Sequence, residues 1–151
     1  MPCLFSTETS DFQLAALSAD DLRMEGRSTK VLVIDDDEEI RKVVRAGLER
    51  HGCTVTEAEN GRDGFKQLQS ALPDLLITDL VMPEQEGLET IQKVRKTFPT
   101  LKIIAMSGGG PMDTNDLLHV ANKLGANASL AKPFSLDALW NEVQNVLKNS
   151  S

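Results

Sequence analysis

Residues 73–83 read PDLLITDLVMP, a stretch in which a short apolar run leads directly to an aspartate. The continuous run 75–77 is typical of a strand that is buried on both faces. Asp79 follows at the carboxyl end of that strand. In an open parallel sheet, ligands and reacting groups gather at the carboxyl ends of the strands, so Asp79 is a candidate functional residue.

Composition narrows the class of protein. The chain has 151 residues, which suffice for one domain with a hydrophobic core but are few for two. Its formal net charge of −7 disfavours nucleic acid and anionic membranes as partners. Cys3 and Cys53 are too few for a disulfide framework or a zinc site. No apolar run approaches the roughly 18 residues of a membrane span, and the N-terminus lacks the basic and apolar regions of an export signal, so we expect a cytoplasmic protein without membrane insertion.

From Lys30 onward, strand-like and helix-like segments alternate five times. The expected strands are residues 31–34, 53–58, 75–78, 101–106 and 128–131. The first three expected helices are residues 38–50, 61–72 and 87–98. A fourth helix is expected to begin at an Asp113 cap and to end at residue 124, and a fifth is expected to begin at a Ser135 cap. The first helix is expected to turn Ile40, Val43, Val44 and Leu48 inward. This alternation predicts a flavodoxin-like α/β fold, a doubly wound five-stranded parallel sheet of order 2-1-3-4-5 with five helices.

Residues 1–29 differ in composition from the rest of the chain, because they are rich in Ser, Thr and Asp. We expect them to form an N-terminal extension that is mostly disordered. A short docking helix around residues 12–22, and a biological start at Met24, remain open alternatives. Residues 30–149 are expected to form the folded domain, and the short stretch after its last helix predicts no output domain.

Three acids, a hydroxyl and a lysine are predicted to converge at one edge of this sheet. The first and third strands are neighbours at the switch point, which brings Asp35, Asp36 and Asp79 close together. Carboxylates at such short separations repel one another unless a cation neutralises them. Their oxygens are ligands of the kind that Mg²⁺ prefers. Ser107 ends the fourth strand and Lys132 ends the fifth. These five side chains suit the transfer of a phosphoryl group to a carboxylate. The metal ion, the lysine ammonium and the serine hydroxyl would stabilise the negative charge on the equatorial oxygens of the phosphoryl group.

Four motifs in this order resemble those of a two-component response-regulator receiver domain: VLVIDDD at 31–37, DLVMP at 79–83, SGGG at 107–110 and KPF at 132–134. The resemblance is to the stand-alone, chemotaxis-regulator type and covers nearly everything but the extension. It implies a single-domain response regulator that accepts a phosphoryl group onto Asp79 from a sensor histidine kinase or a histidine phosphotransfer protein, and so switches partner binding. Such a protein is not a turnover enzyme.

The resemblance also implies a ligand set for Mg²⁺. Asp36, Asp79 and the backbone carbonyl of Val81 would bind the ion directly, and Asp35 would act mostly through water. These roles belong to the family and are carried over to the matching positions.

The same family pattern assigns the phosphoryl contacts and the switch. Lys132 would pair with the phosphoryl group, Ser107 would move to bond it, and Pro133 would follow a cis peptide bond. One position departs from the pattern, because the family usually carries Tyr or Phe three residues before the lysine and this chain has Ser129. The readout on the face formed by the fourth helix, fifth strand and fifth helix is therefore expected to differ.

Other interpretations stay open at this stage. A phosphatase that turns over through an aspartyl-phosphate would want a second acid two residues after the first, where Val81 stands. A phosphorylation-independent scaffold would be expected to lack one of the acids or the lysine, and here all are present. The acidic run 35–39 is also compatible with a solvated helix start. The cognate kinase, the downstream target and the oligomeric state, including a homodimer, are not determined by the sequence.

Overall fold

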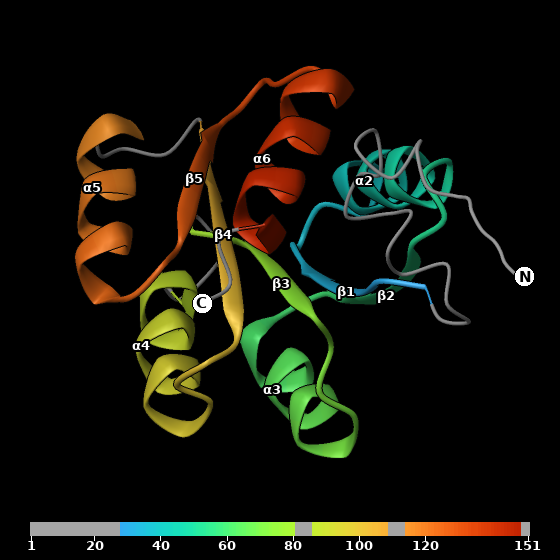
Figure 1. Ribbon diagram of the computed structural model, residues 1–151. Helices are drawn as coiled ribbons and strands as arrows, with labels where there is room; N and C mark the ends of the chain where they lie inside the picture. Colours follow the sequence, from blue (N-terminus) through green and yellow to red (C-terminus); the bar gives the residue numbers. More distant parts are fainter. Residues whose placement is uncertain (1–27, 81–85, 109–113, 149–151) are drawn as a thin grey trace, which may run out of the picture.

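A computed structural model describes residues 28–80, 86–108 and 114–148, in which five strands alternate with five helices (Figure 1). The strands are β1 (Lys30–Ile34), β2 (Thr54–Ala58), β3 (Leu75–Asp79), β4 (Lys102–Ser107) and β5 (Ala128–Ala131). The helices are α2 (Glu38–Glu49), α3 (Gly61–Ser70), α4 (Glu86–Thr97), α5 (Thr114–Leu124) and α6 (Leu136–Lys148). The predicted elements are therefore all present, with ends that differ by a few residues. Nearly all of the predicted extension lies outside the described residues.

The strands form one parallel sheet of order β2-β1-β3-β4-β5, which confirms the predicted topology. Figure 1 shows β2 at one edge of this sheet and β5 at the other. Strand β1 pairs with both β2 and β3, so the strand order reverses beside β1. Ile34 is in register with Thr78, and the acids that follow these two residues therefore end neighbouring strands at the same edge.

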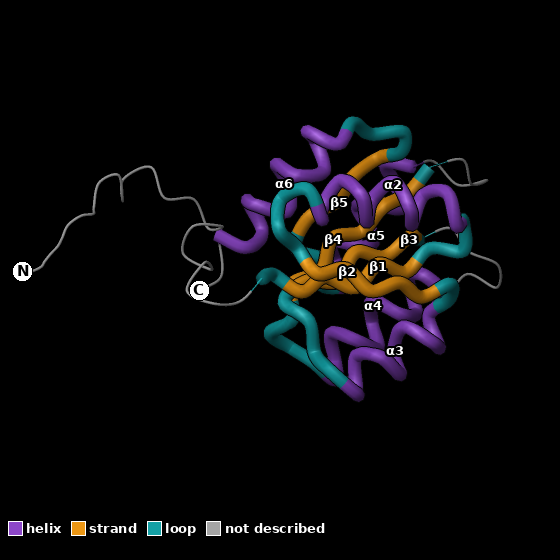
Figure 2. Tube along the Cα trace, turned by 90° about the vertical axis from the view of Figure 1, so that its right-hand side faces the viewer, coloured by secondary structure: helices purple, strands orange, loops and turns teal. Residues whose placement is uncertain are grey.

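Helices cover both faces of the sheet: Figure 2 shows α2 and α6 on one face and α3 and α4 on the other, and α5 shares the core cluster of α3 and α4. Alternate residues of β1 enter opposite cores: Leu32 and Ile34 pack toward α3 and α4, whereas Val31 and Val33 pack toward α2 and α6. A strand covered on both faces has no solvent side, which explains why its sequence is a continuous apolar run rather than an alternating one.

Helix α2 begins at an aspartate cap and packs through a narrow stripe. The Asp37 side chain accepts a hydrogen bond from the Glu39 amide at 2.9 Å. Val44 and Leu48 are buried one turn apart, but Val43 is 48% exposed, so its predicted inward position is wrong. Val43 precedes Val44 by one residue and is rotated from it by about 100° around the helix axis, which turns it to solvent.

Two close contacts fix helices against their neighbours. The His51 ring, just beyond α2, stacks on the Trp140 ring of α6 with centroids 3.9 Å apart. On the other face, a Cβ atom at Gly64 of α3 would overlap the Ile34 side chain, so the glycine lets α3 approach β1 closely. No helix among the described residues is both long and apolar enough to span a membrane.

Candidate functional site

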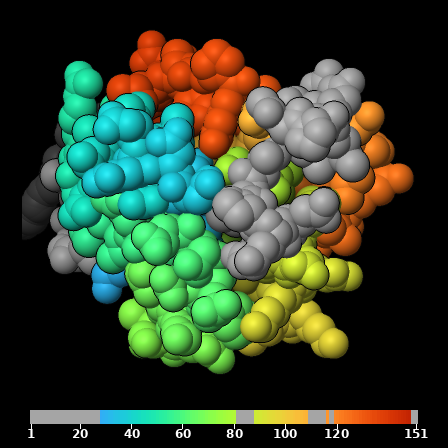
Figure 3. All heavy atoms as spheres, turned by 180° about the vertical axis from the view of Figure 1, so that it is seen from behind, coloured from blue at the N-terminus to red at the C-terminus, as the bar shows by residue number. Residues whose placement is uncertain are grey.

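The predicted acids meet at the carboxyl edge of the sheet. Asp35 directly follows β1, and Asp79 ends β3. One carboxylate oxygen from each of Asp35, Asp36 and Asp79 lies within 4.8 Å of the other two, which confirms the expected cluster. Asp35 and Asp79 are buried, whereas Asp36 is exposed. Figure 3 shows the molecule from behind relative to Figure 1, and the colour bar identifies the atoms of α2, α3, α4, α5 and α6 around this face.

Lys132 joins two of the three acids. It follows β5, and its Nζ lies 2.9 Å from Asp35 Oδ2 and 3.3 Å from Asp79 Oδ1. Its backbone amide donates to the Ser107 carbonyl at 2.8 Å, which ties the end of β5 to the end of β4. The peptide bond between Lys132 and Pro133 is cis, as the family resemblance implied.

The site holds more negative than positive charge. Burial opposes the charged form of Lys132, but its hydrogen bond to Asp35 and the nearby carboxylates outweigh burial and raise the pKa of this lysine. Burial, followed by the charge of Asp35, raises the pKa of Asp36. One ammonium therefore faces three carboxylates, and the remaining repulsion suits a divalent cation with hard oxygen ligands.

Ser107 brings a hydroxyl to this edge. Ser107 is 0% exposed, and its Oγ has no hydrogen-bond partner within the described ranges. A buried hydroxyl without a partner costs roughly 1–3 kcal/mol, so such an atom points to a ligand that it would meet. The next residue, Gly108, lies against the Lys132 backbone: a Cβ there would be 2.9 Å from the Lys132 carbonyl oxygen.

Of the two remaining predicted site residues, Val81 and Ser129, only Ser129 lies among the described residues. Val81, predicted to supply a backbone carbonyl, lies outside the described residues. Ser129 is half-buried in β5, in register with Ala105 of β4. The strand therefore presents a hydroxymethyl group where the family usually has an aromatic ring.

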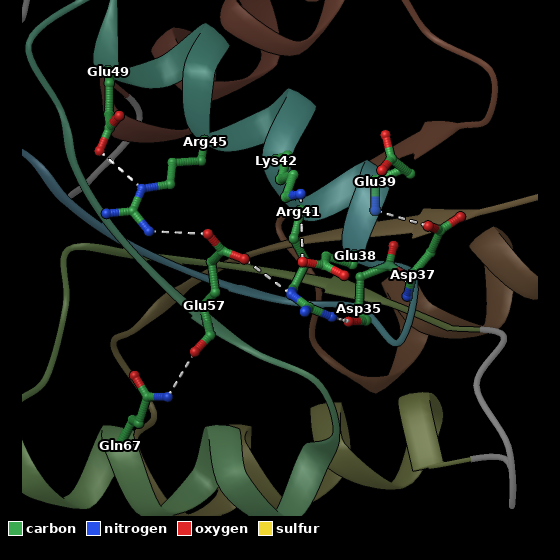
Figure 4. Close-up of polar contacts among 10 residues, drawn as sticks. All are labelled: Asp35, Asp37, Glu38, Glu39, Arg41, Lys42, Arg45, Glu49, Glu57 and Gln67. Atoms are coloured by element: carbon green, nitrogen blue, oxygen red, sulfur yellow. Dashed lines mark hydrogen bonds and ion pairs between the residues drawn. The ribbon is translucent and has the colours of Figure 1, made fainter.

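Two residues at this edge were not singled out from the sequence. Arg41 donates from Nη1 to the Asp35 carbonyl oxygen at 2.6 Å and from Nε to Glu57 Oε1 at 3.0 Å (Figure 4). Glu57 reaches this place because β2 pairs with β1, which sets it beside Val33. The only hint in the sequence is the one-turn spacing of Arg41 from the Asp37 cap.

A model of the response regulator receiver domain family matches residues 31–144 of this chain. The chain belongs to the receiver domain family. The resemblance stated from the motifs is thereby confirmed, and the acidic cluster lies where receiver domains generally bind Mg²⁺. Receiver domains are signalling modules, and histidine kinases or phosphotransfer proteins are their general partners.

This receiver domain is similar to proteins of different length. The response regulator receiver protein CpdR of Brucella abortus is 32% identical over 118 residues, covering 78% of this chain and 96% of CpdR. The DNA-binding transcriptional regulator NtrC of Azospirillum brasilense is 36% identical over 121 residues, covering 80% of this chain but only 24% of NtrC. A crystal structure of a chemotaxis protein from Vibrio cholerae superposes with a TM-score of 0.71 at 29% identity, covering 80% of this chain and 99% of that one.

Proposed function

We propose that this receiver domain accepts a phosphoryl group on Asp79 from a histidine kinase or a histidine phosphotransfer protein, with Mg²⁺ bound at the acidic cluster, and that phosphorylation changes how a partner binds. The observation that carries the proposal is one constellation: the buried Asp79 lies 3.3 Å from the Lys132 ammonium, at the edge where Ser107 holds a buried hydroxyl. Residues 30–149 form the domain in this proposal, residues 1–29 are its extension, and its place is the cytoplasm.

The proposed metal ligands are Asp36, Asp79 and the Val81 carbonyl, with Asp35 acting through water. Both carboxylate oxygens of Asp35 are already engaged: Oδ1 accepts from the Asp37 amide at 2.9 Å and Oδ2 from Lys132 at 2.9 Å. Asp36 is exposed beside them, which supports its role as a direct ligand. When bound, Mg²⁺ supplies positive charge against the oxygens of the transferred group.

The side chains divide the remaining work. A carboxylate oxygen of Asp79 attacks the phosphorus atom, the new phosphorus–oxygen bond forms, and the phosphorus–nitrogen bond to the donor histidine breaks. Lys132 is close enough to Asp79 for its ammonium to stabilise the negative charge that spreads over the phosphoryl oxygens. Ser107 donates its hydroxyl hydrogen to one of these oxygens. The domain thus promotes only its own phosphorylation and dephosphorylation.

The test is the stoichiometry and chemistry of labelling. With Mg²⁺ and acetyl phosphate, intact-mass measurement is expected to show one added phosphoryl group, which hydroxylamine removes because it is an acyl phosphate. Chelation of Mg²⁺ is expected to prevent labelling. A chain that stays unlabelled would favour the scaffold function, and continuous hydrolysis of the phosphodonor without a labelled intermediate would favour a phosphatase.

We expect Asp36→Asn to weaken Mg²⁺ binding by about tenfold or more while leaving the metal-free protein as stable as the wild type, or more so. The substitution removes a direct ligand, but it also removes one of three like charges that a single ammonium faces. Calorimetric titration with Mg²⁺ and thermal unfolding in chelator measure the two effects. A clear fall in the metal-free melting temperature would show that the acids are structural.

A second prediction concerns the switch. Because Ser129 offers far fewer apolar contacts than a ring, phosphorylation is expected to shift the face of α5, β5 and α6 only weakly. A partner that docks by α2 and the loops around the site, such as a histidine phosphotransfer protein, should be less affected. Ser129→Tyr should leave the extent of phosphorylation unchanged but increase the phosphorylation-dependent change in amide exchange over residues 128–131.

Ser129→Ala is the control for this switch prediction, since it alters the residue without adding a ring. The prediction is wrong if the wild-type face already responds strongly to phosphorylation and Ser129→Tyr exchanges in the same way.

A further inference from the structure

The turn that carries the acids is held at both ends. The Asp35 amide donates to the Ala58 carbonyl of β2 at 3.1 Å, and the Asp37 amide donates to Asp35 Oδ1 at 2.9 Å. The Asp37 carbonyl in turn accepts from the Arg41 amide at 3.1 Å, as α2 begins. Asp36 therefore sits between two residues whose backbone is fixed, and its position depends on how firmly they are held.

Arg41 adds a side-chain contact to this turn. Its guanidinium bridges the Asp35 carbonyl oxygen, at 2.6 Å, and the Glu57 carboxylate, at 3.0 Å (Figure 4). The Arg41 side chain is only 14% exposed. One donor of this planar group contacts the carbonyl and a second contacts Glu57, so the two acceptors are linked in a fixed relative direction, which a lysine ammonium on a flexible stem does not reproduce.

Glu57 is itself anchored, so the bridge rests on a fixed charge. Its second carboxylate oxygen accepts from Arg45 Nη1 at 3.0 Å, and its backbone carbonyl accepts from Gln67 of α3 at 2.8 Å (Figure 4). The hydrogen bond from Arg45, together with the hydrogen bond from Arg41 and the charges of both guanidinium groups, outweighs burial and holds the pKa of Glu57 below its ordinary value. Glu57 therefore stays charged at neutral pH, and the contact with Arg41 persists there.

We infer that Arg41 is a positioning residue for the metal site. Its guanidinium links the Asp35 carbonyl to Glu57 by hydrogen bonds and so fixes the turn that presents Asp36 to Mg²⁺. The inference rests on the proposed function only in taking Asp36 and Asp79 as ligands of the ion. Groups that orient metal ligands from outside the ligand set commonly change metal affinity by about 10–100-fold when they are replaced.

Whether Mg²⁺ affinity falls or rises when Arg41 is replaced distinguishes a positioning role from a purely electrostatic one. Arg41 carries a positive charge next to the cation site, so its removal would by charge alone tighten Mg²⁺ binding. If Arg41 positions the turn, its removal weakens binding instead. If Arg41 only ties α2 to β2, its loss lowers stability without weakening Mg²⁺ binding.

Arg45 supplies a matched control for the experiment. It contacts the same Glu57 and carries the same charge, but its guanidinium also pairs with Glu49 rather than with the turn, and its side chain is 47% exposed. In an NMR titration of amide shifts with Mg²⁺ alone, Arg41→Met should bind the ion about tenfold more weakly than the wild type. Arg45→Met should stay within about twofold, because Arg41 and Gln67 still hold Glu57 and because a charge this exposed couples weakly to the site.

Amide exchange in metal-free protein gives a second readout, independent of the ion. The Asp37 amide, which donates to Asp35 Oδ1, should exchange faster in Arg41→Met than in Arg45→Met. Arg41→Lys should recover only part of the Mg²⁺ affinity, and it carries the same test should Arg41→Met fail to fold.

Unchanged or tighter Mg²⁺ binding in Arg41→Met, beside a wild type that binds the ion, would overturn the inference and leave the proposed function intact. A wild type that binds no Mg²⁺ would overturn both.

Discussion

Asp79→Asn is expected to abolish phosphorylation by acetyl phosphate in the presence of Mg²⁺. Asp79 is buried 3.3 Å from Lys132, and both carboxylate oxygens of Asp35, the other buried acid beside this ammonium, already accept hydrogen bonds, so we expect Asp79 to be the acid that attacks. An amide oxygen is a far weaker nucleophile than a carboxylate and forms no stable acyl phosphate here. Intact-mass measurement under conditions that label the wild type fully decides the outcome.

Asp37→Asn provides the control for the acceptor. It removes one negative charge from the same edge, but Asp37 is exposed and caps α2, and asparagine caps a helix as well as aspartate does. This variant should therefore keep wild-type labelling. A phosphoryl group that remains on Asp79→Asn, or that is lost from both variants alike, would contradict the assignment of the acceptor.

The fold and the acidic cluster were predictable because each depends on chain order and burial. The runs that became β1 and β3 are apolar without alternation, which indicates strands covered on both faces. Once the strands alternate with helices, the order at the switch point brings Asp35 and Asp79 together, whatever the details of side-chain packing.

The contacts that hold the site depend on details that no periodic pattern records. Arg41 and Glu57 are 16 residues apart, and they meet only because of the β1–β2 register and the rotation of α2. That same rotation exposes Val43, which the apolar pattern had turned inward. The close approach of Gly108 to the Lys132 carbonyl is likewise a matter of tertiary packing.

Lys132→Met is expected to lower the stability of the metal-free protein by about 3 kcal/mol, because removing one partner of a buried ion pair leaves a charge without compensation. The lysine is the shared partner of Asp35, which is 0% exposed, and of Asp79. Methionine keeps most of the apolar stem and the packing, so the loss reports the charge. Denaturant unfolding in chelator measures it.

Mg²⁺ should restore part of the stability that Lys132→Met loses, since the ion offsets the same carboxylates. Lys132→Arg, which keeps the positive charge, should lose much less. Equal stability of Lys132→Met and the wild type in chelator would contradict the prediction.

Removing an acid from the Lys132→Met background should move stability in the opposite direction. Asp36→Asn takes one negative charge from a cluster that has already lost its ammonium, so the double variant should be more stable than Lys132→Met alone in chelator. Because these side chains share one cluster, the gain should also exceed that of Asp36→Asn in the wild type, and a double-mutant cycle measures this difference as a coupling energy. If the two substitutions are additive, the acids and the lysine do not act as one charge cluster.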